Sequence, residues 1–248
     1  MCNLICALCF AILLIFVAES KHSSSSSKSS ESSHQNGQTA SKFCRFIAME
    51  YANGEGGAEH HHHRHRHHHQ HHHGSNRTTT TDLQAVMEVI RLVSARLDLA
   101  QPVALYKWQH NQSIDDPVRE AALLASVATQ ANASGVAADF AQQFFQDQIN
   151  ASKIIQFAYF ADWQQNGAPN VTAPDLSTVT RPLINNVTSE LVQALAPIQS
   201  IRFERKCPFD VAIGFAQLFG TQQINTNPEA DRAKALCVAL AHICAPIN

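Results

Sequence analysis

Three cationic side chains lie among apolar neighbours in the middle of the sequence. Arg96 directly precedes an apolar position of a helical pattern, Lys107 lies between two aromatic residues in PVALYKW, and Arg119 follows the acidic pair in SIDDPVRE. A buried positive charge needs a partner, and an arginine binds a carboxylate through two parallel N–H bonds. Each cation taken singly is more commonly a surface side chain whose stem covers apolar residues. Together, the three predict a helical domain with a pocket for a doubly negative ligand.

A second polar group follows further along the chain, in the segment DQINASKIIQF. Gln148, Ser152 and Gln156 are spaced four residues apart, so they share one face of a helix. A polar stripe most often faces solvent, but apolar residues flank this one on both sides, which favours a polar-lined pocket as the alternative. Asn150 also begins a glycosylation triplet here, and we interpret that triplet as coincidental if Ser152 and Gln156 line a pocket. The other such triplets begin at Asn76, Asn111, Asn132, Asn170 and Asn186.

The elements that must position these side chains are predicted to be helices. Residues 78–248 are poor in Gly and Pro and rich in Ala, Leu, Gln and Val, which favours helix. The segment TDLQAVMEVIRLVSARLDLA begins with a cap signal and has helical apolar spacing. Its apolar positions are Leu83, Val86, Ile90, Val93 and Leu97. A second helix is predicted in DDPVREAALLASVATQANA, with Asp caps and an early Pro.

Four further helices complete the prediction. AADFAQQFFQDQINASKIIQFAYFADWQQ is a helix of nearly eight turns, and DLSTVTRPLINNVTSELVQALAPI is another, with Pro182 in its first turn. Residues 208–220 and 228–244 are also predicted to be helical. No segment alternates convincingly as a strand. The fold class is therefore all-α, a single helical-bundle domain over 78–248 that is large enough for its own core.

The N-terminal region has a different composition. Residues 3–18 are an apolar run before a small-residue site, which predicts a secretory signal peptide over 1–20, with an uncleaved anchor as the alternative. Residues 21–77 are predicted to be a disordered Ser-rich and His-rich linker. The tract HHHHRHRHHHQHHH is interpreted as a low-complexity spacer rather than a functional metal site, although it would bind nickel or zinc incidentally.

Charge and cysteine content set further limits. The net charge of −2 provides no general basic surface for nucleic acid. A secreted chain can keep disulfides. After removal of the signal, Cys44, Cys207, Cys237 and Cys244 remain, and four cysteines allow three complete pairings between which the pattern does not choose.

Three segments resemble the secreted, gamma-subclass chorismate mutases of the all-helical AroQ type. They are ARLDLAQPVALYKWQHNQSIDDPVRE, FFQDQINASKIIQFAYFADWQ and APDLSTVTRPLI. The resemblance extends over about residues 82–245 and includes the spacing of the polar positions. It implies that chorismate is the substrate and that it is converted to prephenate, an isomerase reaction of aromatic amino acid biosynthesis. This [3,3] rearrangement is unimolecular, and the resemblance implies no cofactor and no metal.

The resemblance also implies catalytic roles for individual residues. Arg96 matches the arginine that holds a substrate carboxylate, and Lys107 matches the lysine that hydrogen-bonds the ether oxygen. Arg119 matches a third pocket cation. Glu120 matches a glutamate on the ring hydroxyl, for which some secreted members use a later Gln where this chain has Leu123.

The remaining matches concern substrate binding and the ether oxygen. Gln156 matches the Gln or Glu that donates to that oxygen, and Ser152 matches a residue that orients a carboxylate. Asp116 falls where some members contact the ring hydroxyl through the backbone. Secreted members have a further arginine near Glu190, so either the register differs, Arg181 or another arginine (Arg202) substitutes, or carboxylate binding is weakened.

The resemblance extends to the end of the chain and to secretion. It implies a disulfide between Cys207 and Cys244, which leaves Cys44 and Cys237 paired or free. A secreted enzyme of this type is expected to be extracellular, and delivery into a host as an effector is one hypothesis. A catalytically weakened binding protein and a His-rich metal-binding protein with the domain as carrier are the alternatives. Whether the protein forms a homodimer is left open.

Overall fold

The computed structural model describes residues 76–219 and 227–246, and within them the regular structure is entirely helical. The helices are α3 (Asn76–Asp98), α4 (Ala100–Gln109), α5 (Pro117–Ala133), α6 (Ala138–Asn166), α7 (Arg181–Ile201), α8 (Cys207–Phe219) and α9 (Asn227–Ala239), with a π-helical turn η1 (Leu176–Thr180) before α7. The predicted all-α class is confirmed. The predicted signal peptide, the Ser-rich tract and the His tract lie outside the described residues.

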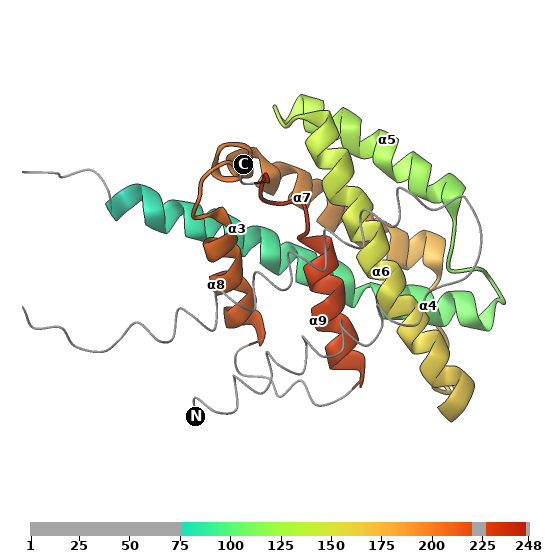
Figure 1. Cartoon of the computed structure of the whole chain (residues 1–248). Helices are drawn as coiled ribbons and strands as arrows, with labels where there is room; N and C mark the ends of the chain where they lie inside the picture. Colours follow the sequence, from blue (N-terminus) through green and yellow to red (C-terminus); the bar gives the residue numbers. More distant parts are fainter. Residues whose placement is uncertain (1–75, 220–226, 247–248) are drawn as a thin grey trace, which may run out of the picture.

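Two long helices, α3 and α6, organise the bundle (Figure 1). Helix α6 packs against α5, α4 and α9, while α3 packs against α7 and α8. Figure 1 shows α5 and α6 as neighbouring rods, with α9 on the other flank of α6 and α8 farther away. Helices α3, α4, α5 and α6 therefore approach one another near the middle of α6, where the polar residues of the sequence are located. None of the described helices combines the length and apolarity of a membrane-spanning segment.

The apolar spacing of the first helix is reproduced in its packing. Val86, Ile90, Val93 and Leu97 are buried, whereas Leu83 is only partly so. They join one core with side chains of α5, α6, α7, α8 and α9. Fully burying such a side chain contributes ~1.5–3 kcal/mol, so this shared core holds α3 in the bundle, chiefly against α7 and α8.

The start of α5 follows from its capping residues. The Asp116 carboxylate accepts a hydrogen bond from the Arg119 N–H at 3.1 Å, and Pro117 occupies the first turn. In return, the Asp116 N–H donates to the Glu120 carboxylate at 3.2 Å. This reciprocal capping resembles a capping box, and it holds Arg119 and Glu120 in the first turn of the helix.

Helix α4 is an element that the sequence pattern left unassigned. The chain turns at Leu99, between the end of α3 and the start of α4. Val103, Ala104 and Leu105 of α4 are buried. Because α4 is short and its apolar residues are consecutive, it has almost no amphipathic periodicity. Its packing on α6 brings Lys107 to the same region as Arg96.

The C-terminal end of the chain is fixed covalently. Cys207 at the start of α8 forms a disulfide with Cys244, so the pairing that the resemblance implied is confirmed. The bond closes a loop over 37 residues of sequence separation. Cys237 is a buried free thiol, while Cys44 lies outside the described residues.

Candidate active site

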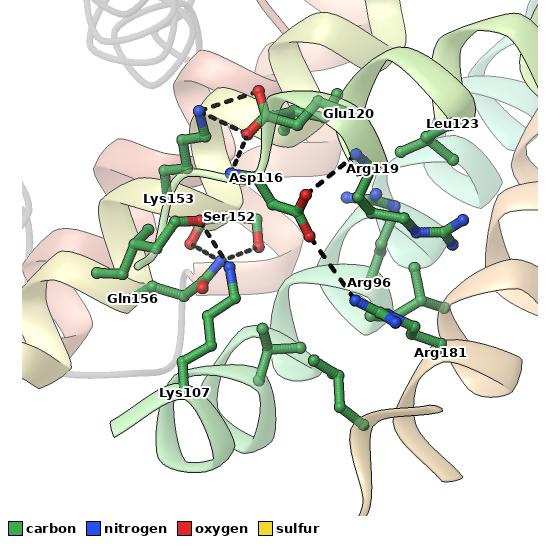
Figure 2. Close-up of a pocket in the computed structure, with 15 residues that line it drawn as sticks. Arg96, Lys107, Asp116, Arg119, Glu120, Leu123, Ser152, Lys153, Gln156 and Arg181 are labelled. Atoms are coloured by element: carbon green, nitrogen blue, oxygen red, sulfur yellow. Dashed lines mark hydrogen bonds and ion pairs between the residues drawn. The ribbon is translucent and has the colours of Figure 1, made fainter. Parts of the chain in front are cut away.

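A pocket of about 630 Å³, including its open mouth, lies between α3, α4, α5, α6, η1 and α7 (Figure 2). The eight predicted site residues all line it: Arg96, Lys107, Asp116, Arg119, Glu120, Ser152, Gln156 and Arg181. Its other walls are Val103, Ile114, Leu123, Ile149, Lys153, Leu176 and Ile184. Helices that are far apart in the sequence thus bring the predicted polar groups together.

Arg96 lies at the bottom of this pocket and is 6% exposed. Its Nη1 donates to the backbone carbonyl of Gln148 at 3.3 Å, and its Nε has no hydrogen-bond partner. Burial lowers its pKa to about 10, and the nearby Arg119 contributes to the same shift. Arg96 therefore stays charged at neutral pH, and within residues 76–219 and 227–246 no carboxylate forms an ion pair with it.

Lys107 is the second buried cation and is 7% exposed. Its Nζ donates to the Ile114 carbonyl at 2.6 Å. Burial lowers its pKa, against the opposing effect of the Asp116 and Glu120 carboxylates. An ammonium has three N–H bonds, so Lys107 keeps two donors for a ligand.

Two arginines lie nearer the mouth of the pocket. Arg119 donates from Nη2 to the Asn185 side-chain oxygen at 2.9 Å, which ties the first turn of α5 to α7. Arg181, the first residue of α7, has its Nη2 3.7 Å from the Asp116 carboxylate. Both guanidinium groups are partly exposed, and Figure 2 shows them on the same side of the Asp116 carboxylate.

The polar stripe on α6 divides into two parts. Gln156 donates to Ser152 Oγ at 3.1 Å, both side chains line the pocket, and the buried Gln156 carbonyl oxygen has no hydrogen-bond partner. Gln148 is outside the pocket: it is 0% exposed and donates to the Ala239 carbonyl of α9 at 2.8 Å. The prediction of a pocket-lining stripe was wrong for Gln148, because α9 covers that turn of α6. Asn150 is partly buried and accepts a hydrogen bond from Gln146.

Lys153 lines the pocket although the sequence pattern did not single it out. Its Nζ lies 2.7 Å from Asp115 Oδ1 and 2.8 Å from Glu120 Oε1. No helical period relates these residues, because Lys153 is on α6 while its partners precede or begin α5. The one feature of the sequence that indicates a pocket position for Lys153 is that it directly follows Ser152.

The open question about Glu190 has a structural answer. Glu190 is exposed on α7, does not line the pocket, and lies near Arg91 of α3. Arg202 is also outside the pocket, with its guanidinium 3.8 Å from the centre of the Phe140 ring. Of the two arginines considered as substitutes, Arg181 is the one that lines the pocket. Glu190 therefore does not place a negative charge in this pocket.

The pocket is lined by more positively than negatively charged side chains. Five cationic side chains line it, against the two carboxylates of Asp116 and Glu120. The cations at the bottom are surrounded by apolar walls, where interactions between charges are less screened than in water. Such an arrangement fits a small molecule with two negative charges, one bound at the buried end of the pocket and one near its mouth. The fold and site thus define a helical bundle that encloses a cationic pocket for a small dicarboxylate.

Comparisons with known proteins agree with this class. Residues 87–157 match the family model described as chorismate mutase type II. The chorismate mutase of Burkholderia thailandensis is 40% identical, with a TM-score of 0.61 over 65% of this chain and 99% of that structure. The chorismate mutase of Burkholderia phymatum is 31% identical, also with a TM-score of 0.61, over 67% of this chain and 99% of that structure. The chain belongs to the type II chorismate mutase family.

Curated relatives are named secreted chorismate mutases. The secreted chorismate mutase of Mycobacterium tuberculosis is 28% identical over 108 residues, 44% of this chain. That of Mycolicibacterium smegmatis is 30% identical over 117 residues, 46% of this chain. The aligned part spans 54% and 64% of the length of these two relatives.

Proposed function

We propose that this protein is a secreted chorismate mutase that converts chorismate to prephenate. The observation that carries the proposal is the buried Arg96, which has one carbonyl contact and no carboxylate partner among the described residues. A dianionic substrate supplies the missing negative charge. Family membership supports the choice of chorismate, since the related Burkholderia structures are named chorismate mutases.

The proposed mechanism requires only positioning and charge stabilisation. Arg96 and Arg119 bind one substrate carboxylate, with Ser152 orienting it, and Arg181 binds at the mouth. Holding both ends of chorismate selects the compact conformer in which the two reacting carbons face each other, which lowers the entropic part of the barrier. The second carboxylate competes with Asp116 for Arg181, whose present distance of 3.7 Å is a weak contact.

The bond that breaks is the C–O bond of the enolpyruvyl ether. Negative charge develops on that oxygen in the transition state, and a donor aimed at it is most effective where water is excluded. Lys107 and Gln156 are the two buried donors on this side of the pocket. Electrons shift within the ring of six atoms, and the new C–C bond forms as the ether bond breaks, so the protein itself forms no covalent bond.

Glu120 and Asp116 complete the site in this proposal. The Glu120 carboxylate accepts a hydrogen bond from the ring hydroxyl, while the Asp116 backbone lies next to it at the start of α5. Leu123 occupies the position at which some members have a glutamine, so in this proposal the side-chain contact to the hydroxyl comes from Glu120.

Lys107→Ala tests the proposed activity. Loss of one donor to the ether oxygen is expected to lower kcat by roughly 10²–10³, by analogy with oxyanion-hole deletions. The decay of chorismate absorbance measures it in the full chain without its signal. Lys206→Ala is the matched control, because Lys206 pairs with Asp82 outside the pocket. An inactive wild-type protein, or equal losses in both variants, contradicts the proposal.

Secretion and domain organisation belong to the same proposal. Residues 1–20 are a signal peptide, 21–77 a linker and 78–248 the mutase domain. The support is the apolar N-terminal run and the secreted relatives of Mycobacterium and Mycolicibacterium. Mass spectrometry of the exported protein tests the cleavage site. An effector role in a host would follow from secretion together with depletion of host chorismate, and it is tested by measuring that pool.

A further inference from the structure

Lys153 lies between two carboxylates on one wall of the pocket. Its Nζ is 2.7 Å from Asp115 Oδ1, and it lies 2.8 and 3.0 Å from the two oxygens of Glu120 (Figure 2). The side chain is 23% exposed, and that of Glu120 is 22% exposed. This ion pair is therefore partly withdrawn from water, and it connects the middle of α6 to the first turn of α5.

The contacts of Glu120 show how its carboxylate is oriented. Oε1 accepts from the Asp116 N–H at 3.2 Å and from Lys153, while Oε2 accepts from Lys153 alone. A carboxylate has about four acceptor positions, so capacity for a further donor remains. Partial burial opposes the charge of Lys153, yet its pKa is raised overall by hydrogen bonds to Asp115 and Glu120. The lysine stays an ammonium in the working pH range.

Glu120 presents an electrostatic difficulty for a dianionic substrate. Its carboxylate must approach the ring hydroxyl, but the same ligand carries two negative charges that repel it at short range. Asp116, the other pocket carboxylate, is already opposed by Arg181. Within the described residues, the cation that directly contacts Glu120 is Lys153.

We propose that Lys153 is a positioning residue of this site: it aims the Glu120 carboxylate into the pocket and offsets its charge, so that a dicarboxylate with a ring hydroxyl binds beside it. This inference rests on the proposed function and extends it, since it names the residue that makes an acceptor carboxylate compatible with a dianion. The interaction with Asp115 is a separate contact that fixes the preceding loop.

A double-mutant cycle separates these two roles. Lys153→Met is expected to lower kcat/KM about tenfold, chiefly through a higher KM, because the unopposed Glu120 then repels the substrate. In a Glu120→Gln background there is no negative charge at position 120 for Lys153 to offset. The same lysine substitution is therefore expected to change kcat/KM by about twofold or less. Lys153→Arg keeps the charge and restores most of kcat/KM. If the methionine variant does not fold, Lys153→Gln takes its place in the cycle.

Two controls make the result specific. Lys206→Met removes a lysine that also pairs with two carboxylates and is 28% exposed, but lies outside the pocket, so it leaves KM unchanged. Asp115→Asn removes the loop contact alone and is also expected to leave KM unchanged, since Asp115 is 58% exposed and does not line the pocket.

Equal losses for Lys153→Met in both backgrounds, or a KM increase in Asp115→Asn as large as in Lys153→Met, would overturn the proposal in favour of a purely structural lysine. Failure of the proposed function is distinct, because the wild-type protein would then not consume chorismate at all.

Discussion

Two arginines near the C-terminal half of α3 are in opposite situations. On one side of the helix, Arg232 of α9 contacts the Asp98 carboxylate at 2.5 Å and Ser94 Oγ at 2.7 Å; we refer to Ser94, Asp98 and Arg232 as the α3–α9 junction. On the other side, Arg96 has one carbonyl contact at 3.3 Å. The junction satisfies its cation within the protein, whereas the pocket leaves its cation available. The difference marks which side of the helix serves folding and which serves a ligand.

The same contrast recurs along α6 between two glutamines. Gln148 donates to the Ala239 carbonyl of α9 and so connects two helices of the core. Gln156, two turns later, donates only within its own helix and keeps an unpaired carbonyl oxygen beside the pocket. Residue type alone does not distinguish the two glutamines. Whether a neighbouring helix covers the side chain determines whether it serves the core or the pocket.

The largest expected effect comes from changing the pocket glutamine to an acid. A Gln side chain donates at any pH, so wild-type turnover should vary little from pH 5 to 8. In Gln156→Glu the side chain donates only while protonated, so kcat at pH 8 should fall by roughly 10²–10³ and recover toward acid pH. The measurement is kcat as a function of pH.

Gln164→Glu is the control for this change, because Gln164 is exposed near the end of the same helix and lies outside the pocket. It should keep the flat profile of the wild type. A steep alkaline decline already present in the wild-type enzyme would contradict the role assigned to Gln156.

Much of the fold was predictable because it follows from local chemistry. Helical apolar spacing predicted α3, the Asp–Pro start predicted α5, and Pro182 marked the first turn of α7. Helix α4 could not be predicted in this way, since its buried residues are consecutive and its packing partner is α6. The π-helical turn before α7 also lacks a local signal beyond its capping Asp175.

The site was predictable as a set of residues more than as a set of contacts. Cations among apolar residues, together with the family spacing, indicated the eight side chains that line the pocket. The environment of Gln148 depends on α9, and the role of Lys153 depends on the Glu120 carboxylate 33 residues earlier in the sequence. Such contacts arise only when distant helices meet, so periodicity cannot reveal them.

The next prediction compares how the two arginines, Arg96 and Arg232, affect the free energy of unfolding. Burial lowers the pKa of Arg96 to about 10. Arg96 is charged at every pH below that value, and carrying the charge in the folded state costs free energy of folding there. Arg96→Met should therefore raise the free energy of unfolding by roughly 1–3 kcal/mol, although it removes a proposed substrate-binding residue. Arg232→Met should instead lower it by about 1 kcal/mol, because it breaks satisfied contacts.

Urea unfolding at pH 7 measures both changes. Since the full cost of the Arg96 charge is present below its folded pKa, the gain should be the same at pH 6 and pH 8. A loss of stability in Arg96→Met comparable to that in Arg232→Met would show that the pocket arginine is as well satisfied as the junction arginine.

The smallest effect concerns a charge that is buried and yet paired. Asp147 of α6 is 2% exposed, and its carboxylate lies 2.7 Å from His242 Nδ1. Burial raises its pKa above 3.8, although His242 and Gln143 oppose the shift. Because the folded pKa exceeds the unfolded one, the folded state binds the proton more tightly. The free energy of unfolding should therefore decrease as pH rises from 3.8 through the folded pKa of Asp147, and stay level above it.

Asp147→Asn removes that titration and should flatten this part of the stability curve, a change of about 1 kcal/mol or less. Urea unfolding between pH 4 and 6 compares the two proteins, and kcat should be the same in both because Asp147 does not line the pocket. Identical slopes would mean that His242 fully offsets the burial of Asp147. The pairing of Asp147 would then be as complete as that of Arg232 at the α3–α9 junction, whereas Arg96 in the pocket has no carboxylate partner among the described residues.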